Sequence, residues 1–258
     1  MLTSLVQAFN EHSAAFFVLA AISVLIVSMS KSGFGAGLGV LSPPLMASQS
    51  SLTEALAILL PLLIAIDMFG LRRFWLNADK RILKLILLPA AIGMLMGYLF
   101  FSVITPQLLS LSIGIFTLLF LIQSLVMSRL KLKEAKPSLW LGRLMGGLSG
   151  FTSFVAHIGG PPITIYMLRE RVSPMVYTST LGIFFTTMNF GKLVPYAQLN
   201  LLNLNQLATS ILLLPCVPVG VYLGFYLAKK ISAKWYFIIV QIFLLVASIK
   251  LIADGLIT

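Results

Sequence analysis

Residues 33–47 read GFGAGLGVLSPPLMA, which places four glycines at alternate positions before a serine and a pair of prolines. The stretch lies inside a long apolar run, residues 14–48, that would otherwise suit a regular helix. In a helix interior glycine costs about 1 kcal/mol and proline about 3 kcal/mol relative to alanine, so the sequence predicts a break here. Pro43 suits the first turn of a new helix, and Ser42 could cap that helix.

A second apolar run, residues 139–168, contains the same kind of break. It reads GGLSG at 146–150 and HIGGPP at 157–162, so glycines again precede a pair of prolines and a new helix should begin there. Irregular backbone at membrane depth persists only where protein or water satisfies its polar groups. The two breaks are therefore expected to line an interior site. The alternative is that these residues only kink packed helices.

The composition of the whole chain indicates a membrane protein. Of its 258 residues, 59% are hydrophobic and 10% are Asp, Glu, Lys or Arg, whereas a soluble domain is about a quarter charged. We therefore predict an all-α integral membrane protein, which excludes soluble enzymes, nucleic-acid binders and secreted disulfide scaffolds. Besides the two broken runs, six stretches approach the roughly 20 residues that cross a bilayer. They are residues 52–70, 82–102, 107–128, 174–191, 206–228 and 235–253.

The basic residues predict the orientation in the membrane. Most of the Lys and Arg residues fall in four connections, which the positive-inside rule places in the cytoplasm. All four can lie on that side only if residues 139–168 enter and return as a hairpin, and residues 14–48 should behave alike. Both termini are then external. The basic connections are residues 71–84, 129–143, 169–171 and 229–234, whereas residues 103–106 and 197–205 carry no basic residue.

Short matches in the same order relate the two halves of the chain. Each half has a broken, re-entrant hairpin followed by three transmembrane helices, and equivalent loops fall on opposite sides. We predict two inverted-topology repeats, residues 1–128 and 139–258, joined by a cytoplasmic loop at 129–138. Such repeats are typical of secondary transporters. The matches are SPPLM at 42–46 with GPPIT at 160–164, LPAAIGMLMG at 88–97 with LPCVPVGVYLG at 214–224, and IGIFTLL at 113–119 with VQIFLLV at 240–246.

The two breaks together suggest an anion site at the membrane midplane. A helix that starts there presents free backbone N–H groups and the positive end of its dipole. Two such starts, related by the inverted repeat, would face each other and bind negative charge. The candidate substrate-binding residues are Lys31, Ser32, Gly33, Gly35, Gly37, Gly39, Ser42, Pro43, His157, Gly159, Gly160, Pro161, Asn189 and Lys192.

Each ionisable candidate also has a structural explanation. Lys31 enters the first glycine tract, where an ionisable group is functional by default, although it could snorkel to an interface. Lys192 lies near a span end, where snorkelling is the stronger alternative. His157 could bind an anion or carry a proton, or be a hydrogen-bonded core histidine. Asp67 is a second proton-coupling candidate, but a structural ion pair near Arg72 explains it more readily.

The segments GFGAGLGVLSPPLMA at 33–47 and GGLSGFTSFVAHIGGPPITIYML at 146–168 resemble the sulfite exporter TauE/SafE family, and the resemblance extends over the chain in length and layout. It implies a transporter of the bacterial inner membrane that moves a sulfur-containing anion such as sulfite, a sulfonate or sulfoacetate, often outward. Leu41-Ser42 stands where the family often has a glycine run, which bears on the choice of anion. The residues implicated are Gly33, Gly35, Gly37, Gly39, Pro43, Pro44, Gly159, Gly160, Pro161 and Pro162.

We therefore expect a secondary transporter, and an exporter, whose two halves alternate access to the anion. An inside-negative potential favours anion exit by about 2.3 kcal/mol per charge per 100 mV. A passive anion channel and a carrier of a non-sulfur organic anion are the alternatives. No enzyme activity is expected, because His157, Asp67 and Cys216 form no catalytic constellation. With one Cys and two His, no metal site or cofactor is expected. The expected partners are the anion and the lipid bilayer, with a homodimer left open and no nucleic acid.

Overall fold

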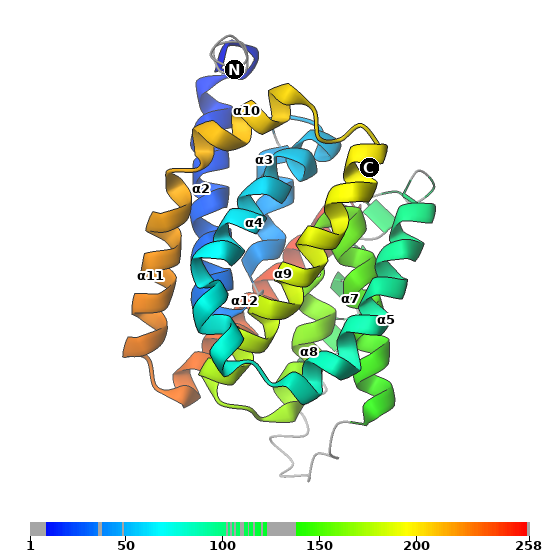
Figure 1. The fold of residues 1–258 in the computed structure, drawn as a ribbon, viewed down its shortest axis with the longest axis vertical. Coiled ribbons are helices and arrows are strands. Elements are labelled where there is room, and N and C mark those ends of the chain that lie inside the picture. Colours follow the sequence, from blue (N-terminus) through cyan, green and yellow to red (C-terminus); the bar gives the residue numbers. More distant parts are fainter. Residues whose placement is uncertain are drawn as a thin grey trace.

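The computed structural model describes residues 9–35, 38–47, 49–101 and 138–256, together with part of residues 103–122. These residues form a bundle of helices and contain no strand, as Figure 1 shows. Three helical stretches are long and apolar enough to cross a membrane, namely Ala14–Phe34, Leu52–Asn77 and Lys80–Leu99. The pair Leu204–Leu213 and Cys216–Lys230, bent by 49°, adds a fourth if it counts as one span. The predicted class of an all-α membrane protein is confirmed.

The first predicted break is present. Helix α2 (Ala14–Met29) continues into a π-helical turn, η1 (Ser30–Phe34), and ends at Gly35, whose φ of +79° suits glycine. A 3₁₀ turn, η2 (Leu38–Leu41), then leads directly into the short helix α3 (Ser42–Ala47). The predicted cap at Ser42 is wrong, because Ser42 is already helical and its hydroxyl donates to the Ser23 carbonyl at 3.0 Å. Gly37 lies outside the described residues.

The second break is sharper. Helix α7 (Leu139–Ala156) ends at His157, which adopts the left-handed conformation with φ 55°. Helix α8 (Gly160–Glu170) begins three residues after His157 with prolines in its first turn, as the sequence predicted. A Cβ added at Gly142, near the start of α7, would lie 2.9 Å from the ring of Tyr166 in α8. Helix α8 therefore returns along α7, which is the expected hairpin.

The remaining described helices match most of the expected spans. Helices α4 (Leu52–Asn77) and α9 (Pro174–Gln198) each extend seven residues past the predicted ends, because a hydropathy pattern detects the bilayer core and not the polar end of a helix. Half of the predicted span 107–128 lies outside the described residues, as does nearly all of the loop 129–138. The other helices are α5 (Lys80–Leu99), α10 (Leu204–Leu213), α11 (Cys216–Lys230) and α12 (Ala233–Leu256).

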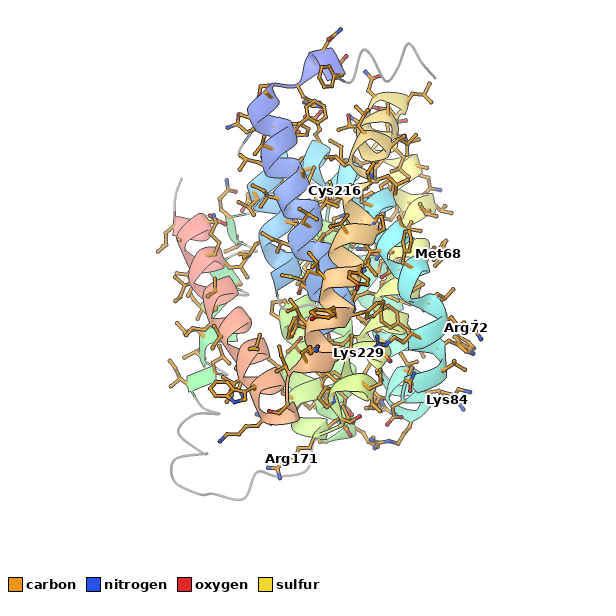
Figure 2. All side chains as sticks on the ribbon, turned by 90° about the vertical axis from the view of Figure 1, so that its left-hand side faces the viewer. Met68, Arg72, Lys84, Arg171, Cys216 and Lys229 are labelled. Carbon is orange, nitrogen blue, oxygen red and sulfur yellow. The ribbon has the colours of Figure 1, made fainter. Side chains whose placement is uncertain are left out.

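The basic connections lie together in space. Figure 2 shows Arg72, Lys84, Arg171 and Lys229 toward one end of the bundle, with Met68 and Cys216 farther from it. These four basic residues come from three of the four connections that the sequence placed on one side of the membrane. The hairpin formed by α7 and α8 brings the chain back to this basic end.

Two helix pairs approach each other at glycines, and both pairs are parallel. Helix α7 packs on α5, where a Cβ at Gly150 would lie 2.0 Å from the Ala90 carbonyl oxygen. Helix α11 packs on α2 and η1, where a Cβ at Gly224 would lie 2.4 Å from the Met29 carbonyl oxygen. Small residues permit such backbone contacts between membrane helices. Each pair joins the first hairpin helix of one half to a later span of the other half.

These contacts predict different responses from two glycines of α7. We expect Gly150→Ala to lower the free energy of unfolding by about 1–3 kcal/mol, because the new methyl group would overlap Ala90. Gly147→Ala is the matched control, since its Cβ would meet the Pro89 carbonyl oxygen at 3.5 Å, an ordinary contact. Thermal unfolding in one detergent compares the two variants. Equal melting temperatures would contradict the close packing of α5 and α7.

Candidate functional site

A cavity of about 30 Å³ lies where the two breaks face each other. This is close to the volume of one water molecule in the liquid, so the cavity is nearly closed in this conformation. The polar part of its wall contains Lys31 from η1, His157 from the second break, and Asn189 and Lys192 from α9. The remaining lining residues are Val27, Gly39, Ser42, Pro43, Leu59, Leu63, Ser153, Gly160 and Phe185.

Lys31 forms a buried ion pair with Asp67 of α4. Its Nζ lies 2.6 Å from Asp67 Oδ1, and the side chains are 7% and 0% exposed. Lys31 is therefore paired inside the bundle and does not snorkel to a membrane interface. The pairing also gives Asp67 a partner other than Arg72. Lys31 sits in the π-helical turn, a local irregularity that is frequent at functional sites. Its Nζ also lies 5.7 Å from the ring centroid of Phe185, within cation–π range.

Lys192 is buried and has three hydrogen-bond partners. Its ammonium donates to Ser153 Oγ at 2.8 Å and to Asn189 Oδ1 at 3.3 Å, and lies 3.0 Å from His157 Nδ1. The other ring nitrogen of His157, Nε2, lies 3.1 Å from the Leu56 carbonyl oxygen. A carbonyl can only accept, so we assign the ring proton to Nε2, and Nδ1 then accepts from Lys192. His157 is neutral in this arrangement, and all three N–H groups of Lys192 are used.

Asn189 connects the two lysines. Its Nδ2 donates to Asp67 Oδ2 at 2.8 Å, while its Oδ1 accepts from Lys192. We call Lys31, Asp67, Asn189 and Lys192 the charge cluster. With both lysines and Asp67 in their ionised forms, the cluster carries one excess positive charge. A buried charge without a counterion is costly, so a cluster of this kind favours the entry of one more anion.

The structure brings eight of the fourteen predicted binding residues to the cavity wall and places five elsewhere. Ser32, Gly33, Gly35, Gly159 and Pro161 do not line the cavity, and Gly37 lies outside the described residues. Gly33 is a packing position, because a Cβ there would lie 2.4 Å from the Gly224 carbonyl oxygen. Gly159 is similar, with a Cβ position 2.7 Å from the Ser149 carbonyl oxygen. The eight lining residues are Lys31, Gly39, Ser42, Pro43, His157, Gly160, Asn189 and Lys192.

Sequence reasoning missed Ser153 and the apolar wall. Ser153 lies one helical turn before His157, so the spacing i, i+4 within α7 could have identified it. Phe185 of α9 carries no such signal, because nothing in the local sequence distinguishes a phenylalanine that faces Lys31 from one that faces a neighbouring helix. Among the described residues, no group of three or more His, Cys, Asp or Glu side chains is placed to hold a metal ion.

Comparison with known proteins gives one match. The model of a family described as sulfite exporter TauE/SafE matches residues 19–251, which include both breaks and all four residues of the charge cluster. No curated protein and no solved structure matches the sequence. The matched region is most of the chain, and the family is the one that the sequence motifs resemble. The chain therefore belongs to the sulfite exporter TauE/SafE family, a family of membrane transporters.

Proposed function

We propose that the protein is a secondary transporter of a small sulfur oxyanion, and that the anion binds at the charge cluster. The observation that carries this proposal is the placement of two buried lysines and a single carboxylate where the two chain breaks face each other. With all three groups ionised, this arrangement has one excess positive charge. Ionisable groups inside a membrane protein mark substrate pathways. A cationic cargo would add to the excess charge and a neutral cargo would leave it unbalanced, whereas one negative charge neutralises it.

In our proposal the dipole of α8 supplements the lysines. Gly160, the first residue of α8, lines the cavity, so the positive end of that helix is directed toward the proposed anion. Helix α3 in the first break has only six residues and continues a 3₁₀ turn, so its dipole contributes less. The two helix starts are therefore unequal, and in our proposal Lys31 and Lys192 provide most of the attraction for the anion.

We also propose that residues 1–128 and 139–258 are inverted repeats that rock against each other. Two observations support this. Each half contains a broken hairpin. In the proposed repeat α5 corresponds to α11 and α7 to α2, and the glycine contacts pair α5 with α7 and α11 with α2, so equivalent elements make equivalent contacts. The cavity must widen to admit an oxyanion, and relative movement of the halves would widen it from one side at a time. In this proposal both termini are external in a bacterial inner membrane, according to the positive-inside rule.

Asp67 is better placed than His157 to exchange a proton during transport. A cargo anion that takes the place of Asp67 on Lys31 leaves a buried carboxylate, which a proton would neutralise. Both ring nitrogens of His157 are already engaged by Lys192 and by a backbone carbonyl. A second proton on His157 would end the bond from Lys192 and place two cations side by side.

Counterflow in proteoliposomes tests the transport proposal. We expect uptake of labelled sulfite to saturate and to accelerate when the vesicles contain unlabelled sulfite or a sulfonate, because a carrier returns faster when loaded. A passive channel would show no such acceleration. Acetate and oxalate, supplied inside the vesicles at the same concentration, test the alternative of a non-sulfur organic anion. If neither sulfite, a sulfonate nor sulfoacetate moves, the proposed substrate class is wrong.

A further inference from the structure

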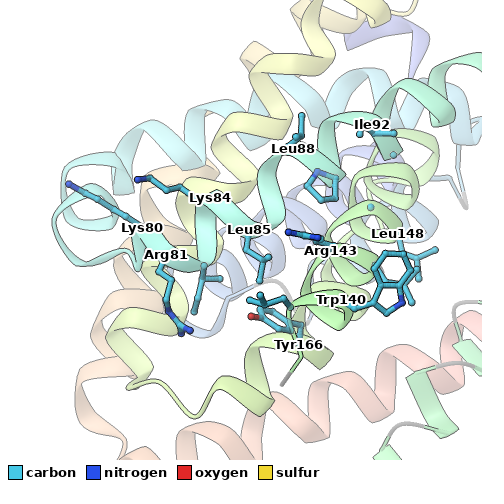
Figure 3. A pocket seen from close by; sticks show the side chains of 16 residues that line it. Lys80, Arg81, Lys84, Leu85, Leu88, Ile92, Trp140, Arg143, Leu148 and Tyr166 are labelled. Atoms are coloured by element: carbon cyan, nitrogen blue, oxygen red, sulfur yellow. The ribbon is translucent and has the colours of Figure 1, made fainter. Parts of the chain in front are cut away.

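We propose that the groove between α5 and α7 binds an anionic phospholipid, with its phosphate against Lys84 and Arg143 and an acyl chain along the groove. The groove has a volume of about 1040 Å³ and lies outside the charge cluster, with which it shares no lining residue (Figure 3). None of the predicted anion-binding residues lines it. The groove therefore needs an occupant other than the transported anion.

The groove is polar at one end and apolar along the rest of its length. Helices α5 and α7 run parallel from the basic end of the bundle, so Lys84 and Arg143 lie near the start of both walls. Farther along, the walls are Leu88 and Ile92 of α5, which are 70% and 57% exposed, and Leu148 of α7. At 1.5 Å per residue, Ile92 lies about 12 Å beyond Lys84 along the helix. That distance suits part of an acyl chain below a headgroup.

Four basic residues line the groove, namely Lys80, Arg81, Lys84 and Arg143, and of these Lys84 and Arg143 are free to bind a phosphate. Arg81 is already engaged by Glu170, whose carboxylate lies 2.6 Å from the guanidinium. Lys84 and Arg143 form no ion pair with any residue that the structure describes. A guanidinium and an ammonium on the two walls of one groove offer the donors that a phosphate diester accepts. Trp140, 71% exposed and lining the same mouth, has the amphipathic ring that is typical of the headgroup level.

Charge complementarity favours an anionic lipid over the other occupants. A zwitterionic lipid brings its own cation to the mouth and leaves the positive charges unbalanced. A second copy of this chain, related by a two-fold axis along the membrane normal and seated on the groove, would bring a second set of the same cations to the same membrane level. Basic pockets between transmembrane helices on the cytoplasmic side are known sites for anionic headgroups.

Brominated lipids test the proposal through Trp140. In a Trp75→Phe/Trp235→Phe background Trp140 is the remaining tryptophan, and bromine on an acyl chain quenches a nearby indole. We expect brominated phosphatidylglycerol to quench Trp140 at least about three-fold more than brominated phosphatidylcholine at equal bromine content. Lys84→Gln/Arg143→Gln should abolish the preference. Lys229→Gln/Lys230→Gln is the matched control at the end of α11 and should retain it.

Three results would overturn the proposal. Equal quenching by the two lipids would show that the groove does not select negative charge. Quenching by neither would show that protein, such as a second copy, covers it. A preference that survives Lys84→Gln/Arg143→Gln would place the lipid elsewhere. If that variant does not fold, phosphatidylglycerol is titrated into the Trp140 protein in neutral detergent. Saturation near one lipid per chain supports the site, and quenching that rises without saturation contradicts it.

Discussion

Replacing Lys192 by methionine should lower the initial rate of sulfite transport at least about 30-fold. Truncating one partner of a buried charged pair costs roughly 2–5 kcal/mol. Each 1.4 kcal/mol corresponds to about a tenfold change, so the lower end of that range gives the expected loss. Methionine approximates the length of lysine but removes the ammonium. The excess charge of the cluster then falls from one to zero, because only Lys31 and Asp67 remain ionised. The anion therefore loses an attractive charge.

Lys229→Met is the matched control for this loss. It removes the same charge from the basic end of α11, at a residue that does not line the cavity, and should leave transport nearly unchanged. Because Ser153, Asn189 and His157 lose their donor, Lys192→Met should also melt at a lower temperature. Gel filtration and the melting curve therefore establish that the variant is folded before its rate is compared. A folded Lys192→Met protein that transports sulfite at the normal rate would remove this lysine from the site.

The parts of the fold that local chemistry decides were predictable. Closely spaced glycines followed by a pair of prolines disfavour a continuous helix. The structure interrupts the first helical stretch after Phe34, at the end of η1, and α7 after Ala156, within the predicted tracts. Helix α4 begins directly after Ser51, whose side chain caps it by accepting from the Glu54 N–H. Serine is a preferred capping residue, so this start also follows from the local sequence. Ser42 was misassigned because the sequence does not reveal the 3₁₀ turn that precedes it.

The contacts that assemble the site were not predictable, because they join distant parts of the chain. Asp67 is five residues from Arg72 in sequence, yet its partner is Lys31, which only the packing of η1 against α4 brings to it. Lys192 was placed near the end of a span, where snorkelling is easy. Helix α9 continues to Gln198, so its ammonium is held inside the bundle by Ser153 and Asn189.

Asp67→Asn should make the stability of the protein depend on its anion. Without the carboxylate, Lys31 is a buried cation with no counterion, and breaking a buried pair in this way costs about 3–5 kcal/mol. We therefore expect a markedly lower melting temperature in the absence of anion. The double variant Lys31→Met/Asp67→Asn is the control, because it removes both charges and should recover most of the loss. If the stability lost in the double variant equals the sum of the losses in the two single variants, Lys31 and Asp67 do not stabilise each other in solution.

The same variant tests the charge count of the site, since Asp67→Asn raises the excess positive charge from one to two. A thermal-shift comparison of methanesulfonate, a monoanion, with sulfoacetate, a dianion, measures the effect, because a ligand of the folded state raises its stability. Compared with the unmodified protein, the variant should gain more in melting temperature from sulfoacetate and less from methanesulfonate. The added anion should also restore much of the stability that the substitution removes. If Asp67 carries the transported proton, residual sulfite flux through the variant should no longer respond to a pH gradient. An unchanged order of the two anions in a folded variant would show that Asp67 does not face the cargo, and that the anion binds away from Lys31.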